Sequence, residues 1–267
     1  MTDPADLARN FLPLVREVAE EAGEVAMRFF RPGQTTSAKI WSKAGGSPVT
    51  EADVAVDTFL KVRLSHALPQ AGWLSEETAD DHRRLGRDLV WIVDPIDGTR
   101  AFLAGNHDWS IAIALLSHDR PILGIVHVPA HGQLFDAVAG HGASRNGEPI
   151  KVSAATTFTD VTVSGPVPFV ERLERRTGAL KRMPRVPSLA LRIARVAEGA
   201  IDLGLVSGNA RDWDIAAADL VLTEAGGRLS RPDGSAPTYN GRDPVHGELV
   251  ASSLALHPAL IDAITRP

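Results

Sequence analysis

The chain has 267 residues, of which 44% are hydrophobic and 23% charged, and its net charge is −5. This composition is ordinary for a globular protein and supplies enough apolar residues for a core in one large domain or two modest ones. The negative charge argues against a nucleic-acid polymer as partner, and the absence of cysteine excludes disulfides, zinc–thiolate sites and thiol nucleophiles.

The N-terminal segment predicts two helices joined by a loop. Residues 1–4 carry no secretory signal and no apolar run approaches the roughly 20 residues of a membrane span, so we expect a cytoplasmic protein without a membrane partner. Apolar residues recur at helical spacing over 11–29, and Pro13 is expected near the start of this helix. Residues 43–48 have loop composition. Thr50 and Asp53 then form a capping-box pattern at the start of a second helix.

The centre of the sequence is an apolar strand that leads into two carboxylates. The strand is expected to stop at Asp94, followed by a proline turn, Asp97 and the pair Gly98-Thr99. Two carboxylates that leave a sheet together can bind a hard divalent cation such as Mg²⁺, which keeps open positions for phosphate. A helix that starts at Thr99 would direct free N–H groups at a bound anion. The pattern indicates a metal-assisted phosphate hydrolase, although Asp-Pro-x-Asp-Gly is also good turn chemistry by itself.

Strands surround this central stretch. A short strand at 72–75 ends at Glu76 and Glu77, and a polar loop follows at 80–88. Apolar or alternating runs then predict an antiparallel meander, and Asn146-Gly147 predicts a further hairpin. The runs of the meander are residues 109–117, 122–128 and 134–139.

The character of the sequence changes near residues 153–157, after which strands and helices alternate. Such alternation is typical of an α/β fold. We therefore expect an N-terminal α+β domain at 1–153 and a C-terminal α/β domain at 154–267. The expected strands are residues 160–164, 201–206 and 248–252. The expected helices are residues 167–177, 189–198 and 214–224.

Each acidic motif has an ordinary explanation when it is taken alone. A Glu-Glu pair is usually a solvated loop, and Asp53 fits the capping box. Asp212 is expected as the N-cap of a helix, and Asp214 in the first turn would favour the helix dipole. Trp213 is expected to pack in the core and to position Asp214.

Together, and in this order, the motifs resemble the inositol monophosphatase superfamily of Mg²⁺-dependent, lithium-sensitive phosphatases. The resemblance covers almost the whole chain, and it implies a layered αβαβα sandwich that is commonly a homodimer. The motifs that carry the resemblance are residues 47–53 (Ser-Pro-Val-Thr-Glu-Ala-Asp), Glu76-Glu77, residues 94–99, Trp213-Asp214 and residues 224–227 (Glu-Ala-Gly-Gly).

The resemblance implies two to three Mg²⁺ ions in each active site. Glu76, Asp94 and the backbone carbonyl of Ile96 would hold one ion. Asp94, Asp97 and Asp214 would hold a second, with Asp94 bridging the two. A third, loosely held ion would depend on Glu76 and on oxygens of the phosphate.

The resemblance also implies how substrate and water are bound. Gly98 and Thr99 would bind phosphate through backbone N–H groups, and Asp97, Ser188 and Asp214 would contact the substrate as well. The catalytic residues would be Asp53, Thr99 and Glu76, with Asp53 and Thr99 orienting the water and helping to deprotonate it. Water would attack phosphorus in line, and no side chain would become phosphorylated.

The resemblance implies a small phosphate ester as substrate, and three esters come into question. Inositol monophosphatases typically place a Glu seven residues before the Trp-Asp aspartate, and Ser207 stands there. Residues 43–53 look more like bacterial 3′(2′),5′-bisphosphate nucleotidases, although Gly45 stands where those proteins often have Asp. We therefore expect hydrolysis of adenosine 3′,5′-bisphosphate to AMP, with inositol-1-monophosphatase and histidinol-phosphate phosphatase as alternatives.

A basic stretch before Ser188 has two interpretations. Its cations would suit a second phosphate on the substrate, or they belong to a solvated helix face interleaved with Glu171 and Glu174. The stretch comprises Arg172, Arg175, Arg176, Lys181, Arg182 and Arg185.

Three competing classes have less support. A haloacid-dehalogenase-type phosphatase needs Asp-x-Asp, whereas Asp94 and Asp97 are three residues apart. A dinucleotide-binding fingerprint fails because Arg145 stands where the third glycine after Gly140 and Gly142 belongs. An inert regulatory or binding relative is disfavoured because all four predicted ligand carboxylates are present.

Overall fold

The computed structural model describes residues 3–42 and 48–265, so the loop expected at 43–48 falls almost entirely outside it, as does Gly45. The described helices are α1 (Pro4–Met27), α2 (Glu51–Ala67), α3 (Thr99–Leu103), α4 (Val167–Thr177), α5 (Leu189–Ala197), α6 (Asp212–Glu224) and α7 (His257–Thr265).

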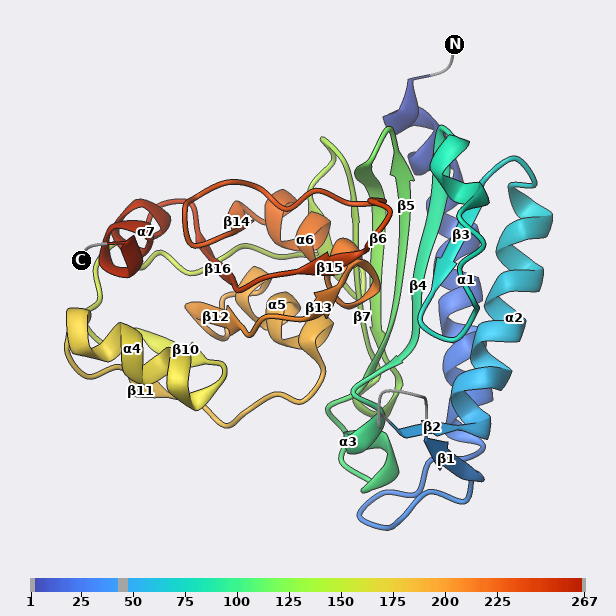
Figure 1. Cartoon of the computed structure of the whole chain (residues 1–267), viewed down its shortest axis with the longest axis horizontal. Coiled ribbons are helices and arrows are strands. Elements are labelled where there is room, and N and C mark those ends of the chain that lie inside the picture. The colour runs from blue at the N-terminus through green and yellow to red at the C-terminus, as the bar shows by residue number, and fades with distance from the viewer. Residues whose placement is uncertain (1–2, 43–47, 266–267) are drawn as a thin grey trace.

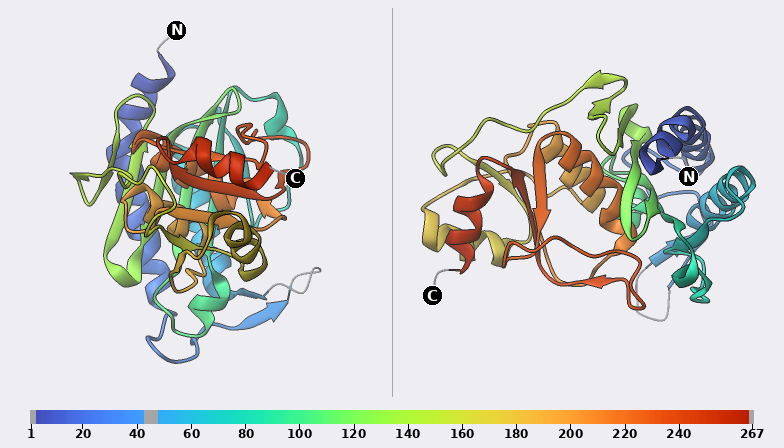
Figure 2. Two further views of the ribbon diagram at one scale, coloured as in Figure 1. Left: turned by 90° about the vertical axis from the view of Figure 1, so that its left-hand side faces the viewer. Right: turned by 90° about the horizontal axis from the view of Figure 1, so that it is seen from above.

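Helices and sheets alternate in layers (Figure 1). Helices α1 and α2 cover one face of a seven-stranded sheet, and α5 and α6 lie between this sheet and a five-stranded one. Helices α4 and α7 lie on the far side of the second sheet, and Figure 2 shows the same layers from above. The αβαβα sandwich implied by the resemblance is confirmed.

The seven-stranded sheet follows chain order from β3 to β9. Strands β3 and β4 are parallel and all later neighbours are antiparallel, which confirms the predicted meander. Asn146 and Gly147 adopt φ angles of 51° and 82°, as a tight hairpin turn requires. The strands are β3 (Gly72–Ser75), β4 (Leu89–Asp97), β5 (Ser110–Ser117), β6 (Arg120–Val128), β7 (Gln133–Val138), β8 (Ala143–Arg145) and β9 (Glu148–Pro149).

The central strand does not stop at Asp94, and that prediction was wrong. Asp94 pairs with Ala112 and Asp97 pairs with Ser110, with an irregularity of register between them. Proline cannot donate to a sheet ladder, and Pro95 falls within this irregular segment, where the regular pairing is interrupted. Both carboxylates therefore lie on one strand, close to the start of α3.

The five-stranded sheet has the order β11-β10-β12-β16-β14. Strands β11, β10 and β12 are parallel, whereas β16 is antiparallel to both of its neighbours. The expected strands and helices of this half are confirmed to within a few residues, but β11, β14 and α7 were not predicted. The strands are β10 (Thr162–Ser164), β11 (Lys181–Arg182), β12 (Leu203–Val206), β14 (Gly227–Ser230) and β16 (Leu249–Ser253).

Two short ribbons complete the described structure. Strand β1 (Ile40–Ser42) pairs with β2 (Pro48–Thr50), and β13 (Ala210–Arg211) pairs with β15 (Val245–His246). Among the helices of the described ranges, none is both long and apolar enough to cross a membrane.

Two local expectations in the N-terminal half were wrong. Helix α1 begins at Pro4, because Asp3 accepts the N–H of Ala5 as an N-cap, so Pro13 lies in the helix interior. The polar segment 80–88 is more than a loop, because it contains a 3₁₀ turn at Arg83–Gly86 in which Arg84 is buried.

The core between the two sheets contains residues from both halves of the chain. Ile92 and Val126 of the first sheet share one cluster with Ile215 of α6 and Ala251 of the second sheet. The boundary near residue 153 stays a prediction, but the apolar packing is continuous across it.

Candidate active site

A cavity of about 480 Å³ lies where the end of β4 meets α3, the segment before α5 and the start of α6. Its wall includes all the acidic residues predicted as metal ligands, together with the predicted phosphate-binding pair. These wall residues are Glu76, Asp94, Asp97, Gly98, Thr99 and Asp214.

Three carboxylates converge at the base of this cavity. Asp94, Asp97 and Asp214 each place an oxygen within 4.8 Å of the other two. Burial raises the pKa of Asp94 well above its ordinary value, and the charges of Glu76 and Asp97 raise it further. Burial and the charge of Asp97 likewise raise the pKa of Asp214. The charge of Arg211 acts in the opposite direction on Asp214 but does not cancel these effects.

These residues fit a divalent cation. Buried carboxylates are costly unless they are paired or coordinate a metal. Hard oxygen ligands are those that Mg²⁺ prefers, and the cavity beside them leaves room for phosphate. The cluster could therefore bind a metal.

Backbone N–H groups hold the carboxylates of Asp94 and Asp214 in place. Asp94 Oδ1 accepts the backbone N–H of Ile96 at 3.0 Å. Asp214 Oδ2 accepts the N–H of Arg211 at 2.7 Å, which completes the N-terminal cap of α6. Arg211 is thus the N-cap residue, and the expectation that Asp212 has this place was wrong, because Asp212 is the first residue of the helix.

Asp97 is held by the start of α5. Its Oδ2 accepts the hydroxyl of Ser188 at 2.6 Å and the N–H of Ala190 at 2.7 Å. Burial raises the pKa of Asp97 to about 6, although these hydrogen bonds act in the opposite direction. Ser188 itself is 0% exposed and is the N-cap of α5. Ser188 is not among the residues of the cavity wall, and its predicted contact with substrate stays a prediction.

Asp53 takes part in the cap of α2 and also contacts Thr99, and its catalytic role stays a prediction. Its Oδ2 accepts the N–H of Thr50 at 2.8 Å and the Thr50 hydroxyl at 2.6 Å, so the capping box is present. Its Oδ1 accepts the hydroxyl of Thr99 at 3.3 Å. The same hydroxyl oxygen lies 3.2 Å from the carbonyl oxygen of Ile96, so its one proton has two alternative acceptors. Asp53, Thr99 and this predicted ligand carbonyl therefore lie together.

A buried arginine beneath the site was missed by sequence reasoning. Arg192 donates to the carbonyls of Val186 and Leu205 at 2.7 and 3.0 Å. Burial lowers its pKa to about 10, while the charge of Asp97 opposes this change. The signal was a charged residue one turn after Ser188 on an otherwise apolar helix face. Arg192 fixes the segment that carries Asp97's partners.

Much of the basic stretch before α5 belongs to a paired, solvated surface. Arg172 pairs with Glu248, Lys181 with Asp160, and Arg182 with Glu174. Arg185 differs, because it lines the cavity. Arg100 and Asn106, which the sequence did not single out, also line the cavity.

The sequence matches the Inositol monophosphatase family over residues 8–266. Similar relatives include inositol monophosphatase 2 of Solanum lycopersicum, 31% identical over 96% of this chain and 98% of the relative. The 3′(2′),5′-bisphosphate nucleotidase CysQ of Aggregatibacter actinomycetemcomitans is 30% identical over 89% of this chain and 90% of its own. The histidinol-phosphatase of Chlorobaculum parvum is 32% identical over 95% and 96%.

The fold is also similar to that of a solved structure. The crystal structure of the extragenic suppressor protein suhB from Bartonella henselae superposes with a TM-score of 0.82, at 26% identity, over 96% of this chain and 99% of that one. Fold and acidic cavity thus define a phosphatase of a metal-dependent kind. The chain belongs to the inositol monophosphatase family.

Proposed function

We propose that the protein is a Mg²⁺-dependent phosphomonoesterase that hydrolyses a small phosphorylated metabolite. The observation that carries this proposal is the convergence of Asp94, Asp97 and Asp214 within 4.8 Å, in a cavity that also contains Glu76 and Thr99. Bound Mg²⁺ would acidify the attacking water and neutralise charge on the phosphate oxygens. Glu76, Asp94, Asp97, Asp214 and the carbonyl of Ile96 would hold two or three such ions.

The remaining site residues would orient the reactants. Asp53 and Thr99, joined at 3.3 Å, would position the water and accept its proton. Gly98 and Thr99 lie at the N-terminal end of α3, where backbone N–H groups are not used within the helix and can bind phosphate. The Asp94–Asp97 spacing disfavours a phospho-aspartate, and trapping of one would contradict this mechanism.

Two arginines of the cavity wall favour a substrate with a second anionic group. Arg100 and Arg185 both line the cavity, and the side chain of neither makes a hydrogen bond or ion pair within the described parts of the chain. Arginines are well suited to bind phosphate through parallel N–H donors. This observation supports a 3′(2′),5′-bisphosphate nucleotidase, with adenosine 3′,5′-bisphosphate converted to AMP.

Inositol 1-phosphate and histidinol phosphate are the alternative substrates. Ser207, at the position where a glutamate would be expected to contact inositol, is exposed and is not among the residues of the cavity wall. Histidinol phosphate stays open, because a relative with that name is as similar as the others. A binding protein without activity is disfavoured, because no predicted ligand carboxylate is missing from the cavity.

A substrate panel with a matched pair of variants tests this proposal. Phosphate release from adenosine 3′,5′-bisphosphate, inositol 1-phosphate and histidinol phosphate is measured with Mg²⁺ and with EDTA. Arg185→Met is expected to lower kcat/KM for the bisphosphate by roughly tenfold or more, as loss of a charge-assisted contact does. Arg182→Met, which removes an exposed and paired cation, is the control. Equal kcat/KM for the bisphosphate in both variants would exclude Arg185 as its second contact, and release from no ester would favour the inert binding protein.

Three further expectations from the sequence stay predictions. They are a homodimer, a cytoplasmic location, and the division into domains at 1–153 and 154–267.

A further inference from the structure

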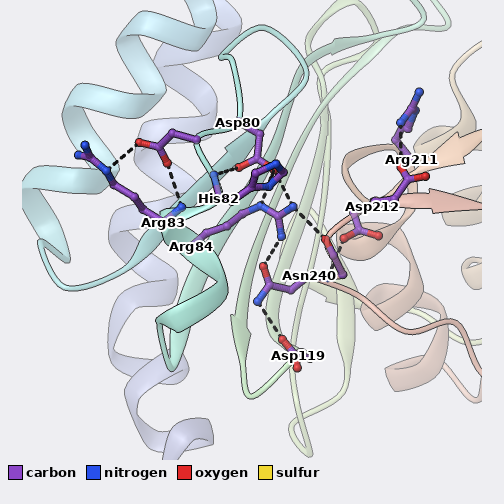
Figure 3. A network of polar contacts seen from close by, with 11 residues as sticks. Asp80, His82, Arg83, Arg84, Asp119, Arg211, Asp212 and Asn240 are labelled. Carbon is purple, nitrogen blue, oxygen red and sulfur yellow. Dashed lines mark hydrogen bonds and ion pairs between the residues drawn. The ribbon is translucent and has the colours of Figure 1, made fainter.

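A buried polar network joins the segment that follows Glu76 to the start of α6 (Figure 3). At its centre is Arg84, whose side chain is 0% exposed. Its guanidinium donates to Asp80 Oδ2 at 2.8 and 3.1 Å, to Asn240 Oδ1 at 2.6 Å and to the carbonyl of Gly241 at 2.9 Å. One buried cation therefore connects two segments that are more than 150 positions apart in the sequence.

Asn240 continues the network to α6. Its backbone has a φ of 58°, and its N–H donates to Asp212 Oδ2 at 2.7 Å. The other oxygen of Asp212 lies 2.6 Å from Nε2 of His246, and the Asn240 amide donates to Asp119 at 2.9 Å. The first residue of α6 is thus fixed through both of its carboxylate oxygens. Asp214, two residues further, is one of the three converging carboxylates.

The other end of the network packs against β3. A Cβ atom on Gly72 would lie 2.8 Å from Cβ of Arg84, so only glycine admits the arginine backbone at this distance. Gly72 is the first residue of β3, and Glu76 directly follows the last. Neither Arg84 nor Asn240 is among the residues of the cavity wall. The network therefore contacts the elements that carry Glu76 and Asp214 without touching the cavity.

A buried charged side chain such as Arg84 is not needed to fill space. Burying a guanidinium costs free energy that its hydrogen bonds only partly recover, and an apolar side chain of similar size often gives equal or greater stability. What the hydrogen bonds supply, and an apolar side chain does not, is a fixed distance between Asp80, Asn240 and Gly241.

We propose that Arg84 and Asn240 are positioning residues that set the separation of Glu76 from Asp214 and thereby the affinity of the acidic cluster for its divalent cation. This inference rests on the proposed metal-dependent function. It assigns a role to a network that lies outside the cavity and that contains none of the proposed ligands.

The test measures metal binding without turnover. Binding of Mg²⁺ and of Mn²⁺ to the whole chain is measured by isothermal titration calorimetry, and the half-maximal concentration is compared among variants. Arg84→Met keeps the volume and removes the donors. Asn240→Gly keeps the positive φ and the N–H to Asp212 but removes the acceptor of Arg84, so it serves if Arg84→Met does not fold. Both are expected to raise the half-maximal concentration roughly three- to tenfold, and Arg84→Lys is expected to restore part of the loss.

Leu260→Ala is the matched control. Leu260 is fully buried on α7, at the end of the molecule away from β4 (Figure 1), so this variant lowers Tm without reaching the network. An unchanged half-maximal concentration in Leu260→Ala beside raised values in the network variants supports the positioning role. Half-maximal concentrations equal to that of the wild type in both Arg84→Met and Asn240→Gly would overturn the positioning role but not the metal centre. No response of the wild-type protein to either ion would overturn the metal centre and this proposal together.

Discussion

Asp94 is the most buried of the three converging carboxylates. It is 1% exposed, its Oδ1 accepts the N–H of Ile96, and four other acids raise its pKa in addition to burial. A buried carboxylate in this position destabilises the metal-free fold and is useful only when a cation compensates it. The Asp94 carboxylate would therefore lower the stability of the metal-free protein although it is needed to bind the cation.

Asp94→Asn is expected to abolish phosphatase activity, by roughly 10³-fold or more in kcat, because one residue would serve two ions. The fold should stay intact, since the amide keeps the shape and the acceptor for Ile96. In EDTA the Tm should equal or exceed that of the wild type, because repulsion within the cluster is reduced. Activity assays and thermal melts check both parts. A variant that retains most of its turnover would exclude the bridging role.

Ser207→Glu tests the opposite expectation at a single residue. Ser207 is exposed and is no proposed metal ligand, so the variant should retain phosphatase activity to within about twofold and shift stability by no more than about 0.5 kcal/mol. Phosphate release from the preferred ester of the panel is the measurement. Complete loss of activity would show that this position lies closer to the chemistry than the cavity wall indicates.

Helix α6 packs closely against the first sheet at one glycine. A Cβ atom on Gly124 of β6 would lie 2.5 Å from the backbone carbonyl of Ala217. A backbone carbonyl in a packed helix cannot move aside without moving the helix. The glycine therefore sets how closely α6, and with it Asp214, approaches the sheet.

Gly124→Ala should destabilise the protein by about 1–3 kcal/mol, as overpacking of a close-packed core does. The free energy of unfolding in denaturant is the measurement. Gly247→Ala is a suitable control, because an added Cβ at that glycine meets nothing within 4 Å. Equal stability of the two variants would mean that α6 adjusts to the methyl group without cost.

Local patterns identified most elements, and long-range contacts account for the failures. The capping box at Thr50, the hairpin at Asn146-Gly147 and the helix at Val167–Thr177 depend on neighbouring residues and were predicted correctly. The continuation of β4 beyond Pro95 depends on pairing with β5, which no local pattern contains. Strand β14 is short, and it exists because β16 pairs with it.

The site shows the same division. The acidic motifs could be read from the sequence, since strand ends and helix starts place carboxylates predictably. Arg84 could not, because its partner Asn240 is distant in sequence and a polar segment gives no sign that one arginine is buried. Ser188 was placed in the correct neighbourhood, but only the packing shows that its hydroxyl donates to Asp97.

At the scale of the whole molecule, the acidic cluster determines how stability responds to pH. The pKa of Asp97 in the folded protein is about 6, against an ordinary value of 3.8. The folded state therefore binds more protons than the unfolded state between these values. The stability that this proton provides is complete below pH 3.8 and is lost as the pH rises through about 6. Asp202, whose pKa is lowered by its hydrogen bonds despite partial burial, titrates below 3.8 and acts outside this window.

The metal-free protein should therefore lose stability from pH 5 to pH 7. Asp97 contributes roughly 1 kcal/mol of this loss, because only the upper part of its titration between 3.8 and about 6 falls in this range. Mg²⁺ should reverse this loss, because it binds the deprotonated acids, so its stabilising effect should grow over the same range. Melts in EDTA and in Mg²⁺ at several pH values provide the measurement. Burial also raises the pKa of Asp219 to about 6. Its part of the stability loss with rising pH is not reversed by Mg²⁺, because Asp219 is not a proposed ligand. A metal-free Tm that stays level or rises with pH would contradict the placement of these acids.

The packing of α5 and α6 between two sheets has a consequence for how the chain can be divided. The strands of residues 72–149 form backbone hydrogen bonds only within their own sheet, so their pairing alone would suggest that this part of the chain can fold independently. Yet Ile92, Val126 and Phe135 are covered by helices that the later half provides. In a fragment ending at residue 153 this apolar surface would be exposed to solvent, and the fragment would aggregate. The two fragments produced by dividing the chain at residue 153 should therefore be insoluble when each is expressed separately. Phosphatase activity should be recovered only when both fragments are expressed together.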